Sequence, residues 1–223
     1  MKIFGHRGAA GLVAENTLES IQQALHYKVD GIEIDVHCCK SGELVVIHDN
    51  TVDRTTNGSG AVLDFTLKEL RQLKTAEGYT IPTLMDVITI IDNQCILNIE
   101  LKGEGTAIAV SSLLKSIEKL YSENIIISSF DPDQLRVFRK ENPDCALGVL
   151  TEANTMTVLP IAEELQAFSI HPPIEYLKKE AVERAHQKGF QVYAWTVNSK
   201  KYIKKAYAMG VDAIISDFPN FAV

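Results

Sequence analysis

The chain has 223 residues, of which 46% are hydrophobic, and this favours a folded α/β domain of barrel size over a disordered chain. Its formal net charge is −7, from 22 Lys and Arg against 29 Asp and Glu. Nucleic acid is therefore disfavoured as a partner, because a phosphate backbone requires a basic protein face. No apolar run is long enough to span a bilayer and no signal core follows Met1, so we expect a soluble, cytoplasmic protein.

The cysteines support the same expectation about the compartment. None of the four shows a metal-binding spacing such as C-x-x-C, and Cys38 and Cys39 are adjacent, which prevents an ordinary disulfide between them. We therefore expect Cys38, Cys39, Cys95 and Cys145 to be free thiols in a reducing compartment.

The first predicted strand runs from Lys2 to His6 and leads into the sequence His6-Arg7-Gly8. Asn16, with Glu19 three residues later, is typical of a helix N-cap, so a helix is predicted from Thr17 to Lys28. Its place after a strand is the first sign of alternating strands and helices.

The second predicted strand, Gly31 to Asp35, carries two acids two residues apart. Because side chains alternate across a strand, Glu33 and Asp35 face one side and the apolar Ile32 and Ile34 face the other. Two carboxylates on one face repel each other unless a cation lies between them, and Mg²⁺ and Ca²⁺ prefer oxygen ligands. A surface strand with a polar side is the simpler interpretation. We favour a divalent-cation site, because similar polar pairs recur at later strand ends.

Residues 36–47, with Ser41-Gly42 in the middle, are too few for a crossover between parallel strands. They predict a hairpin that folds back and brings His48 close to Glu33 and Asp35. A turn-rich stretch at 53–60 follows, and after it a short helix. We expect the whole segment of about residues 36–82 to be an insertion after the second strand.

From Pro82 onward, helical and strand patterns alternate regularly. Helices are predicted over 83–92, 106–121, 131–140, 157–165, 175–188 and 199–209, and strands over 96–101, 125–129, 145–150, 167–170, 191–197 and 213–216. With the first two strands this makes eight, and eight such units close into a (β/α)8 TIM barrel. A doubly wound open sheet is the competing architecture, but no G-x-G-x-x-G or P-loop follows a strand. We therefore predict one TIM-barrel domain over residues 1–223.

Barrel active sites form where the strands end, and polar residues recur at these ends. A single histidine there usually belongs to the rim, and a single Glu-x-Lys is usually a salt bridge. So many polar residues at one end of a barrel instead favour a functional site. They are His6, Arg7, Glu33, Asp35, Glu100, Lys102, Ser128, Ser129, His171, Trp195, Asn198 and Asp217.

These motifs resemble the glycerophosphodiester phosphodiesterase family of the bacterial cytoplasmic type. The similar segments span the chain and are GHRGAAGLVAENTLES, GIEIDVHCCKSGELVVIHD, DRTTNGSG, IPTL, LNIELKG, YAWTVN and GVDAIISDFP. The family has a (β/α)8 barrel with a small insertion after its His-Asp pair. Ala14 departs from the family pattern, which usually has proline there, and so does Cys38-Cys39. Both lie away from the presumed chemical centre.

The resemblance implies roles for eight residues and a divalent metal ion, Mg²⁺ or Ca²⁺, as cofactor. Glu33, Asp35 and Glu100 would be the metal ligands. His6 and His48 would be the catalytic acid and base. Arg7 and Lys102 would bind the phosphate of the substrate, and Trp195 would contact its glycerol group.

The chemistry of phosphodiesters agrees with these roles. A metal ion and two basic side chains would neutralise the substrate's negative charge and favour the more highly charged transition state. Because histidine titrates near neutrality, one ring can take a proton from the nucleophile while the other protonates the leaving alkoxide. The residues leave open which histidine is which, and whether the nucleophile is water or the substrate's own hydroxyl.

The expected reaction is metal-dependent hydrolysis of a glycerophosphodiester to sn-glycerol 3-phosphate and an alcohol. One alternative is a phosphodiesterase that acts on lysolipids, in the manner of a lysophospholipase D, and it would need an apolar entry surface. Another is a barrel that binds phosphate ligands without turnover, for which two histidines and three acids are superfluous. The sequence does not specify an oligomeric state.

Four further polar residues carry narrower expectations. His37 lies on the hairpin, where it either supports the site residues or, as we favour, is exposed. We expect His171 either to belong to the rim or to contact the substrate. Asp49 is expected to orient the loop that carries His48, and Asp217 to cap or pair at the barrel mouth without binding metal.

Overall fold

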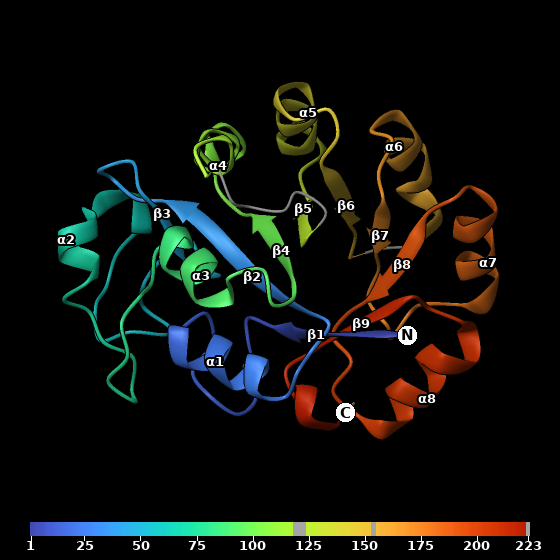
Figure 1. The fold of residues 1–223 in the computed structure, drawn as a ribbon, viewed down its shortest axis with the longest axis horizontal. Helices are drawn as coiled ribbons and strands as arrows, with labels where there is room; N and C mark the ends of the chain where they lie inside the picture. The colour runs from blue at the N-terminus through green and yellow to red at the C-terminus, as the bar shows by residue number, and fades with distance from the viewer. Residues whose placement is uncertain (118–123, 153–154, 222–223) are drawn as a thin grey trace.

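The computed structural model describes residues 1–117, 124–152 and 155–221, which form a closed barrel of parallel strands surrounded by helices (Figure 1). β1 pairs with β9 on one side and with β2 on the other, and this closes the ring. The barrel strands are β1 (Lys2–His6), β2 (Gly31–Cys38), β4 (Ile96–Leu101), β5 (Ile125–Ser129), β6 (Ala146–Leu150), β7 (Ser169–His171), β8 (Gln191–Ala194) and β9 (Ala213–Ser216). The predicted (β/α)8 barrel is thereby confirmed, since an open sheet would leave two unpaired edges.

The helices between the strands cover the outside of the ring (Figure 1). They are α1 (Leu18–His26), α3 (Leu84–Ile91), α4 (Thr106–Lys115), α5 (Pro132–Glu141), α6 (Leu159–Glu164), α7 (Lys179–Gln187) and α8 (Lys200–Met209), with short 3-10 turns at Thr155–Thr157 and Pro219–Phe221. The helix predicted over 106–121 ends at Lys115, and residues 118–121 lie outside the described part. α4, α5 and α8 have ten residues each, and no described helix is long and apolar enough to cross a membrane.

The insertion after β2 projects from the barrel and has a small core of its own. Its strand β3 (Leu44–Val46) pairs antiparallel with the far end of β2, as the predicted hairpin requires. A 3-10 turn at Val62–Asp64 and helix α2 (Leu67–Leu70) follow, and α2 lies beyond α3 in Figure 1. The apolar residues that pack together here are Cys39, Val45, Ile47, Val52, Val62, Leu70 and Ile81.

The alternation along β2 places apolar side chains outside the barrel and acids inside it. Ile32, Ile34 and Val36 are fully buried in the core cluster that the helices share with the strands. The intervening Glu33 and Asp35 point into the barrel, as the alternation predicts. Burial of the apolar set therefore determines which way the two carboxylates face.

The residue that caps α1 differs from the prediction. Thr17 is the N-cap, and its side chain accepts a hydrogen bond from the Ser20 backbone nitrogen. The predicted cap, Asn16, has a φ of 56° and is buried, and its Nδ2 donates to Asp35 Oδ2 at 2.9 Å. The N-cap prediction at Asn16 was wrong because two adjacent residues both favour a cap, and the contact with Asp35 decides between them.

Candidate active site

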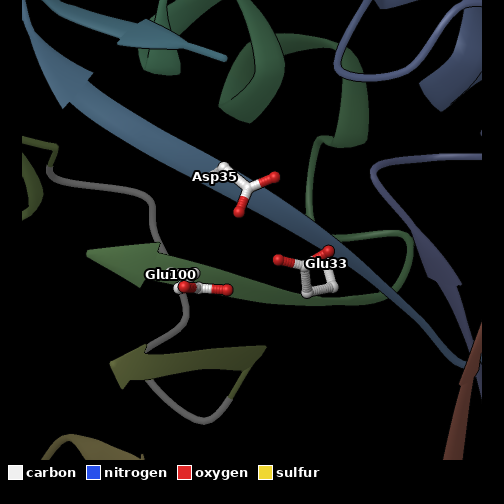
Figure 2. A group of neighbouring side chains, drawn as sticks. All are labelled: Glu33, Asp35 and Glu100. Atoms are coloured by element: carbon white, nitrogen blue, oxygen red, sulfur yellow. The ribbon is translucent and has the colours of Figure 1, made fainter. Parts of the chain in front are cut away.

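Three carboxylates converge inside the barrel, Glu33 and Asp35 from β2 and Glu100 from β4 (Figure 2). One oxygen atom from each lies within 4.8 Å of the other two. The residues are 4%, 1% and 7% exposed, and Glu33 Oε1 has no hydrogen-bond partner among the described residues. Buried oxygens that converge in this way, one of them unpartnered, fit a hard divalent cation.

The electrostatics of the cluster favour a cation. Burial, followed by the charges of Asp35 and Glu100, raises the pKa of Glu33 well above its usual range. Burial and the Asp35 charge raise the pKa of Glu100 to about 7, although Lys102 opposes the shift. Without a cation Glu33 and Glu100 therefore keep their protons to a higher pH than ordinary glutamates do, and a bound divalent ion would replace those protons.

Two basic side chains contact these acids. Lys102 Nζ donates to Glu100 Oε1 at 2.9 Å and lies 3.9 Å from Asp35 Oδ1. Arg7 Nε lies 3.3 Å from Asp35 Oδ2, while Arg7 Nη1 donates to Glu15 Oε1 at 2.8 Å. Both side chains line the cavity beside the cluster, where an anionic substrate would find positive charge.

The turn after β1 aims Arg7 at the cluster. Arg7 has a φ of 49° and Gly8 a φ of 84°, so both adopt the left-handed conformation. A Cβ atom at Gly8 would lie only 2.5 Å from Ser20 Oγ, and this position therefore requires glycine. The turn directs the Arg7 backbone nitrogen to Glu33 Oε2, at 3.1 Å.

His6 lies between two carboxylates. Its Nδ1 is 2.5 Å from Asp217 Oδ1, and its Nε2 is 3.8 Å from Glu33 Oε2. Asn198 holds Asp217 by donating to Oδ2 and by accepting from the Asp217 backbone nitrogen. Burial alone would raise the pKa of Asp217, but the hydrogen bond and charge of His6, together with Asn198 and Arg7, outweigh burial and lower it. Asp217 thus pairs at the barrel mouth, as expected, and orients His6.

His48 reaches the same cavity from the end of the hairpin. Its Nδ1 is 2.6 Å from Asp49 Oδ1, and its Nε2 is 3.3 Å from Lys102 Nζ. Arg54 donates to both oxygens of Asp49 and to both oxygens of Glu15. Asp49 therefore contacts the His48 ring directly, in addition to its predicted role of orienting the loop. Arg54 links Asp49 to Glu15, the carboxylate that also binds Arg7.

Two of the expectations for other histidines need revision. His37 was expected to be exposed and is only 6% exposed, because β2 continues past Asp35 and turns it inward. Its Nε2 donates to the His48 carbonyl oxygen at 3.1 Å, which supports the His48 loop. His171 is fully buried against Ser169 Oγ and stacks on Tyr193, and it does not line the cavity. Burial lowers the pKa of His171 to about 3, so its ring is neutral.

These groups surround a cavity of about 360 Å³. Its charged lining residues are His6, Arg7, Glu33, His48, Glu100, Lys102 and Glu152, and its apolar side is formed by Phe130, Leu150, Trp195 and Ile215. Trp195 Nε1 donates to the His171 carbonyl oxygen at 2.7 Å, and the ring meets Phe130 edge-on with centroids 5.6 Å apart. The cavity thus suits a ligand with an anionic end and a small carbon skeleton.

The structure brings all eight predicted site residues together at one end of the barrel. Sequence reasoning missed Glu15, Asn16 and Arg54 as the partners that orient them, and also the apolar neighbour Phe130. It named Asn198 only as a polar strand-end residue, without its contact with Asp217. The ENT and DRTT segments contain three of these partners, so the motifs themselves were the available signal. Their contacts depend on loops that meet only in the folded chain.

The barrel fold with a charged cavity at the strand ends places this protein among the TIM-barrel enzymes. The chain belongs to the glycerophosphoryl diester phosphodiesterase family, whose sequence model matches residues 6–221. A glycerophosphodiester phosphodiesterase of Caldanaerobacter subterraneus subsp. tengcongensis is 38% identical, over 98% of this chain and 94% of that protein. One of Bacillus altitudinis is 35% identical, over 100% of this chain and 96% of that protein.

Solved structures agree with this assignment. An Oleispira antarctica phosphodiesterase in complex with the product sn-glycerol-3-phosphate superposes with a TM-score of 0.92 at 30% identity, over 99% of this chain and 94% of that one. A glycerophosphodiester phosphodiesterase from Thermotoga maritima superposes with a TM-score of 0.84 at 28% identity, over 100% of this chain and 96% of that one.

Proposed function

We propose that this protein hydrolyses glycerophosphodiesters to sn-glycerol 3-phosphate and an alcohol, with a divalent cation, Mg²⁺ or Ca²⁺, held by Glu33, Asp35 and Glu100. The observation that carries the proposal is the convergence of these three buried carboxylates beside two histidines at one cavity. Family membership supports the reaction, and the oxygen-only ligand set supports a hard cation.

The residues around the cavity divide the work of the reaction. Arg7 and Lys102 bind the phosphate oxygens, and their positive charge favours the transition state, which is more negative than the substrate. A bound divalent ion would add Lewis-acid polarisation of the phosphate. Trp195 supplies an apolar face for the carbon skeleton of the glycerol group.

His6 and His48 carry the proton transfers. Each ring has its Nδ1 occupied by an aspartate, Asp217 or Asp49, which leaves Nε2 facing the cavity. One Nε2 removes the proton from the nucleophile, and the other donates a proton to the leaving alkoxide oxygen. The nucleophile is either water, which gives sn-glycerol 3-phosphate directly, or the substrate's own hydroxyl, which gives a cyclic phosphate that water then opens. The aspartates hold the rings in the orientation and tautomer that this exchange needs.

The reaction is tested by incubating the protein with glycerophosphocholine and Mg²⁺ or Ca²⁺, with and without a chelator. We expect release of glycerol phosphate that the chelator abolishes. Absence of cleavage with any divalent ion would leave a barrel that only binds phosphate ligands. Much faster turnover of lysophosphatidylcholine would instead favour the lysolipid reaction.

The ligand set is tested separately by calorimetric titration with the metal alone. We expect Glu33→Gln to weaken metal binding, because it replaces a buried carboxylate oxygen with a neutral amide. His6→Ala is expected to retain metal binding and to lose turnover. Glu180→Gln, the same change at an exposed residue of α7, serves as the control. Unchanged metal binding in Glu33→Gln would contradict the ligand assignment.

We also propose the cytoplasm as the place of action. All four cysteines are free, and Cys39 and Cys95 are buried. Burial raises the pKa of Cys95 to about 12, which keeps it a thiol. Free thiols persist in reducing compartments, where they face no pressure to form disulfides. Fractionation of cells that express the protein with its native ends tests this location.

A further inference from the structure

Two buried polar side chains of the cavity lack a hydrogen-bond partner in the part of the chain that the structure describes. Asn98 on β4 is 1% exposed and Ser128 on β5 is fully buried, and both line the cavity. Neither Oδ1 nor Nδ2 of Asn98, nor Oγ of Ser128, has a hydrogen-bond partner among the described residues. Buried polar groups are almost always paired, and leaving them unpaired costs stability. Their retention here indicates that a ligand completes their hydrogen bonds.

The strand register places these two side chains beside the proposed metal ligands. Asn98 lies opposite Glu33 in the pairing of β2 with β4, and Ser128 lies opposite Glu100 in the pairing of β4 with β5. Trp195 belongs to the apolar side of the same cavity. Asn98 and Ser128 are thus two uncharged polar groups that face a substrate held between the acids and the apolar side.

The chemistry of the two side chains selects the ligand. An amide offers one acceptor and two donor hydrogens, and a hydroxyl offers one donor and two acceptor positions. A phosphate oxygen suits the basic Arg7 and Lys102 better, because Asn98 Oδ1 would repel it. Two neighbouring hydroxyl groups on a ligand suit Asn98 and Ser128, because each hydroxyl can both donate and accept a hydrogen bond.

We propose that Asn98 and Ser128 form a hydroxyl-recognition subsite, which binds the vicinal hydroxyls of a small polyol attached to the phosphate. The inference rests on the proposed function and deepens it, because it makes two uncharged side chains responsible for recognising the glycerol group of the substrate. A site built to bond a substrate hydroxyl discriminates strongly against analogues that lack it, since its own polar groups are then left unpaired.

Other unpartnered buried atoms provide a matched control. Tyr193 also has a buried hydroxyl without a partner among the described residues, but it lies in the barrel interior and does not line the cavity. Ser128→Ala and Tyr193→Phe therefore each remove one unpaired hydroxyl. Only the first removes it from the proposed subsite.

The first experiment compares kcat/KM for glycerophosphocholine with kcat/KM for bis(p-nitrophenyl) phosphate, a phosphodiester without hydroxyls. We expect the ratio of the two values to fall about 10- to 100-fold in Asn98→Leu and about three- to tenfold in Ser128→Ala, since each lost hydrogen bond costs up to about tenfold. Tyr193→Phe should keep the ratio of the wild type. An unchanged ratio in Asn98→Leu, or equal loss on both substrates, would overturn the proposal.

The second experiment separates this proposal from the proposed function. Calorimetry measures binding of sn-glycerol 3-phosphate and of inorganic phosphate to each variant in the presence of the divalent ion. Asn98→Leu should weaken binding of sn-glycerol 3-phosphate at least tenfold more than binding of inorganic phosphate. If the wild type cleaves neither diester, the proposed function fails, and this binding comparison still tests the subsite. Equal weakening of the binding of both ligands would refute the hydroxyl-recognition subsite.

Thermal stability gives a third, independent measurement. Ser128→Ala should melt at or above the temperature of the wild type, because it removes an unpaired buried hydroxyl. A residue that stabilised the fold through a hydrogen bond would show the opposite. A clear fall in the melting temperature of Ser128→Ala would therefore count against a role in ligand recognition.

Discussion

The two histidines at the cavity differ in what holds the far nitrogen of each ring. His6 is 16% exposed in its side chain, and its partner Asp217 is held by the neutral amide of Asn198. His48 is 32% exposed, and its partner Asp49 is held by the cation Arg54. One pair is built from barrel strand ends, and the other from the insertion.

This difference shows that the fold positions two similar histidine–aspartate pairs by different structural means. β1 and β9 are hydrogen-bonded neighbours, so sheet pairing alone brings His6 close to the residue that follows β9. His48 depends on a hairpin, a turn and an ion-pair chain through Arg54 to Glu15. We therefore expect the His6 pair to be rigid, and the His48 pair to respond to salt and to changes in the insertion.

Removal of either ring should have the largest effect. We expect His6→Ala and His48→Ala each to lower kcat for glycerophosphocholine by about 10²- to 10⁴-fold, the usual contribution of a positioned acid or base. His186→Ala is the matched control, because His186 also pairs with an aspartate but lies away from the cavity. Steady-state kinetics with saturating metal measures the effect. Loss below tenfold at either position would remove that histidine from the proton transfer.

Substitution of the two aspartates should distinguish the His6 pair from the His48 pair more clearly than removal of the rings does. Asp217→Asn is expected to lower kcat by about 10- to 100-fold, because the amide can present a donor where the ring needs an acceptor. Asp49→Asn should have a smaller effect, since water can replace part of the lost contact at this more exposed position. Asp212→Asn, which alters the control pair with His186, should leave kcat unchanged. A larger loss in Asp49→Asn than in Asp217→Asn would reverse the comparison.

Arg54 tests whether the insertion positions His48. We expect Arg54→Met to lower kcat about two- to fivefold, the range of exposed ion pairs, and Arg54→Lys to restore part of it. The wild-type rate should also fall more steeply with salt than that of Arg54→Met, because screening weakens the exposed ion pairs. Arg71→Met is the control, since Arg71 forms an exposed ion pair with Asp86. Identical salt dependence of Arg54→Met and the wild type would argue against this role.

A further effect, on stability, concerns the acids between the two histidines. The pKa of Glu100 is raised to about 7 from an ordinary 4.5, so the folded protein binds this proton more tightly than the unfolded chain does. Its contribution to stability is therefore complete below pH 4.5 and is lost as the pH rises through about 7. Across this window the melting temperature of the chelated protein should fall by several degrees, because the change in pKa corresponds to about 3 kcal/mol.

Calorimetric melting with a chelator measures this dependence. Glu100→Gln should flatten the fall, and a divalent ion should stabilise the wild type most at the alkaline end, where the carboxylates are ionised. The control Glu180→Gln should retain the wild-type pH dependence. A melting temperature that rises with pH in the chelated wild type would contradict the raised pKa.

Predictions that depended on local pattern were accurate. The alternation of Ile32, Glu33, Ile34 and Asp35 indicated both the buried face and the acidic face of β2, because apolar burial determines how a strand is rotated. The repeated strand and helix patterns indicated the barrel, since parallel strands need helical crossovers. The short spacing of residues 36–47 indicated the hairpin for the same reason.

Errors arose where distant contacts decide. The expectation that His37 is exposed failed because the strand was predicted to end at Asp35. In the structure β2 continues to Cys38, so His37 shares the inward face of Asp35. Asn16 failed as a cap because its side chain binds Asp35 instead, 19 residues further along the chain.

The sequence by itself determined the barrel, the acids of β2 and β4, and the placing of both histidines at strand ends. Each follows from periodicity and spacing, which are properties of neighbouring residues. Only the tertiary structure decided the partners, such as Asp217 for His6, which is 211 residues away. It alone also revealed that Asn98 and Ser128 line the cavity without hydrogen-bond partners among the residues that the structure describes. Hydrogen bonding is directional and short in range, so a pairing between distant segments exists only once the ring of strands has closed.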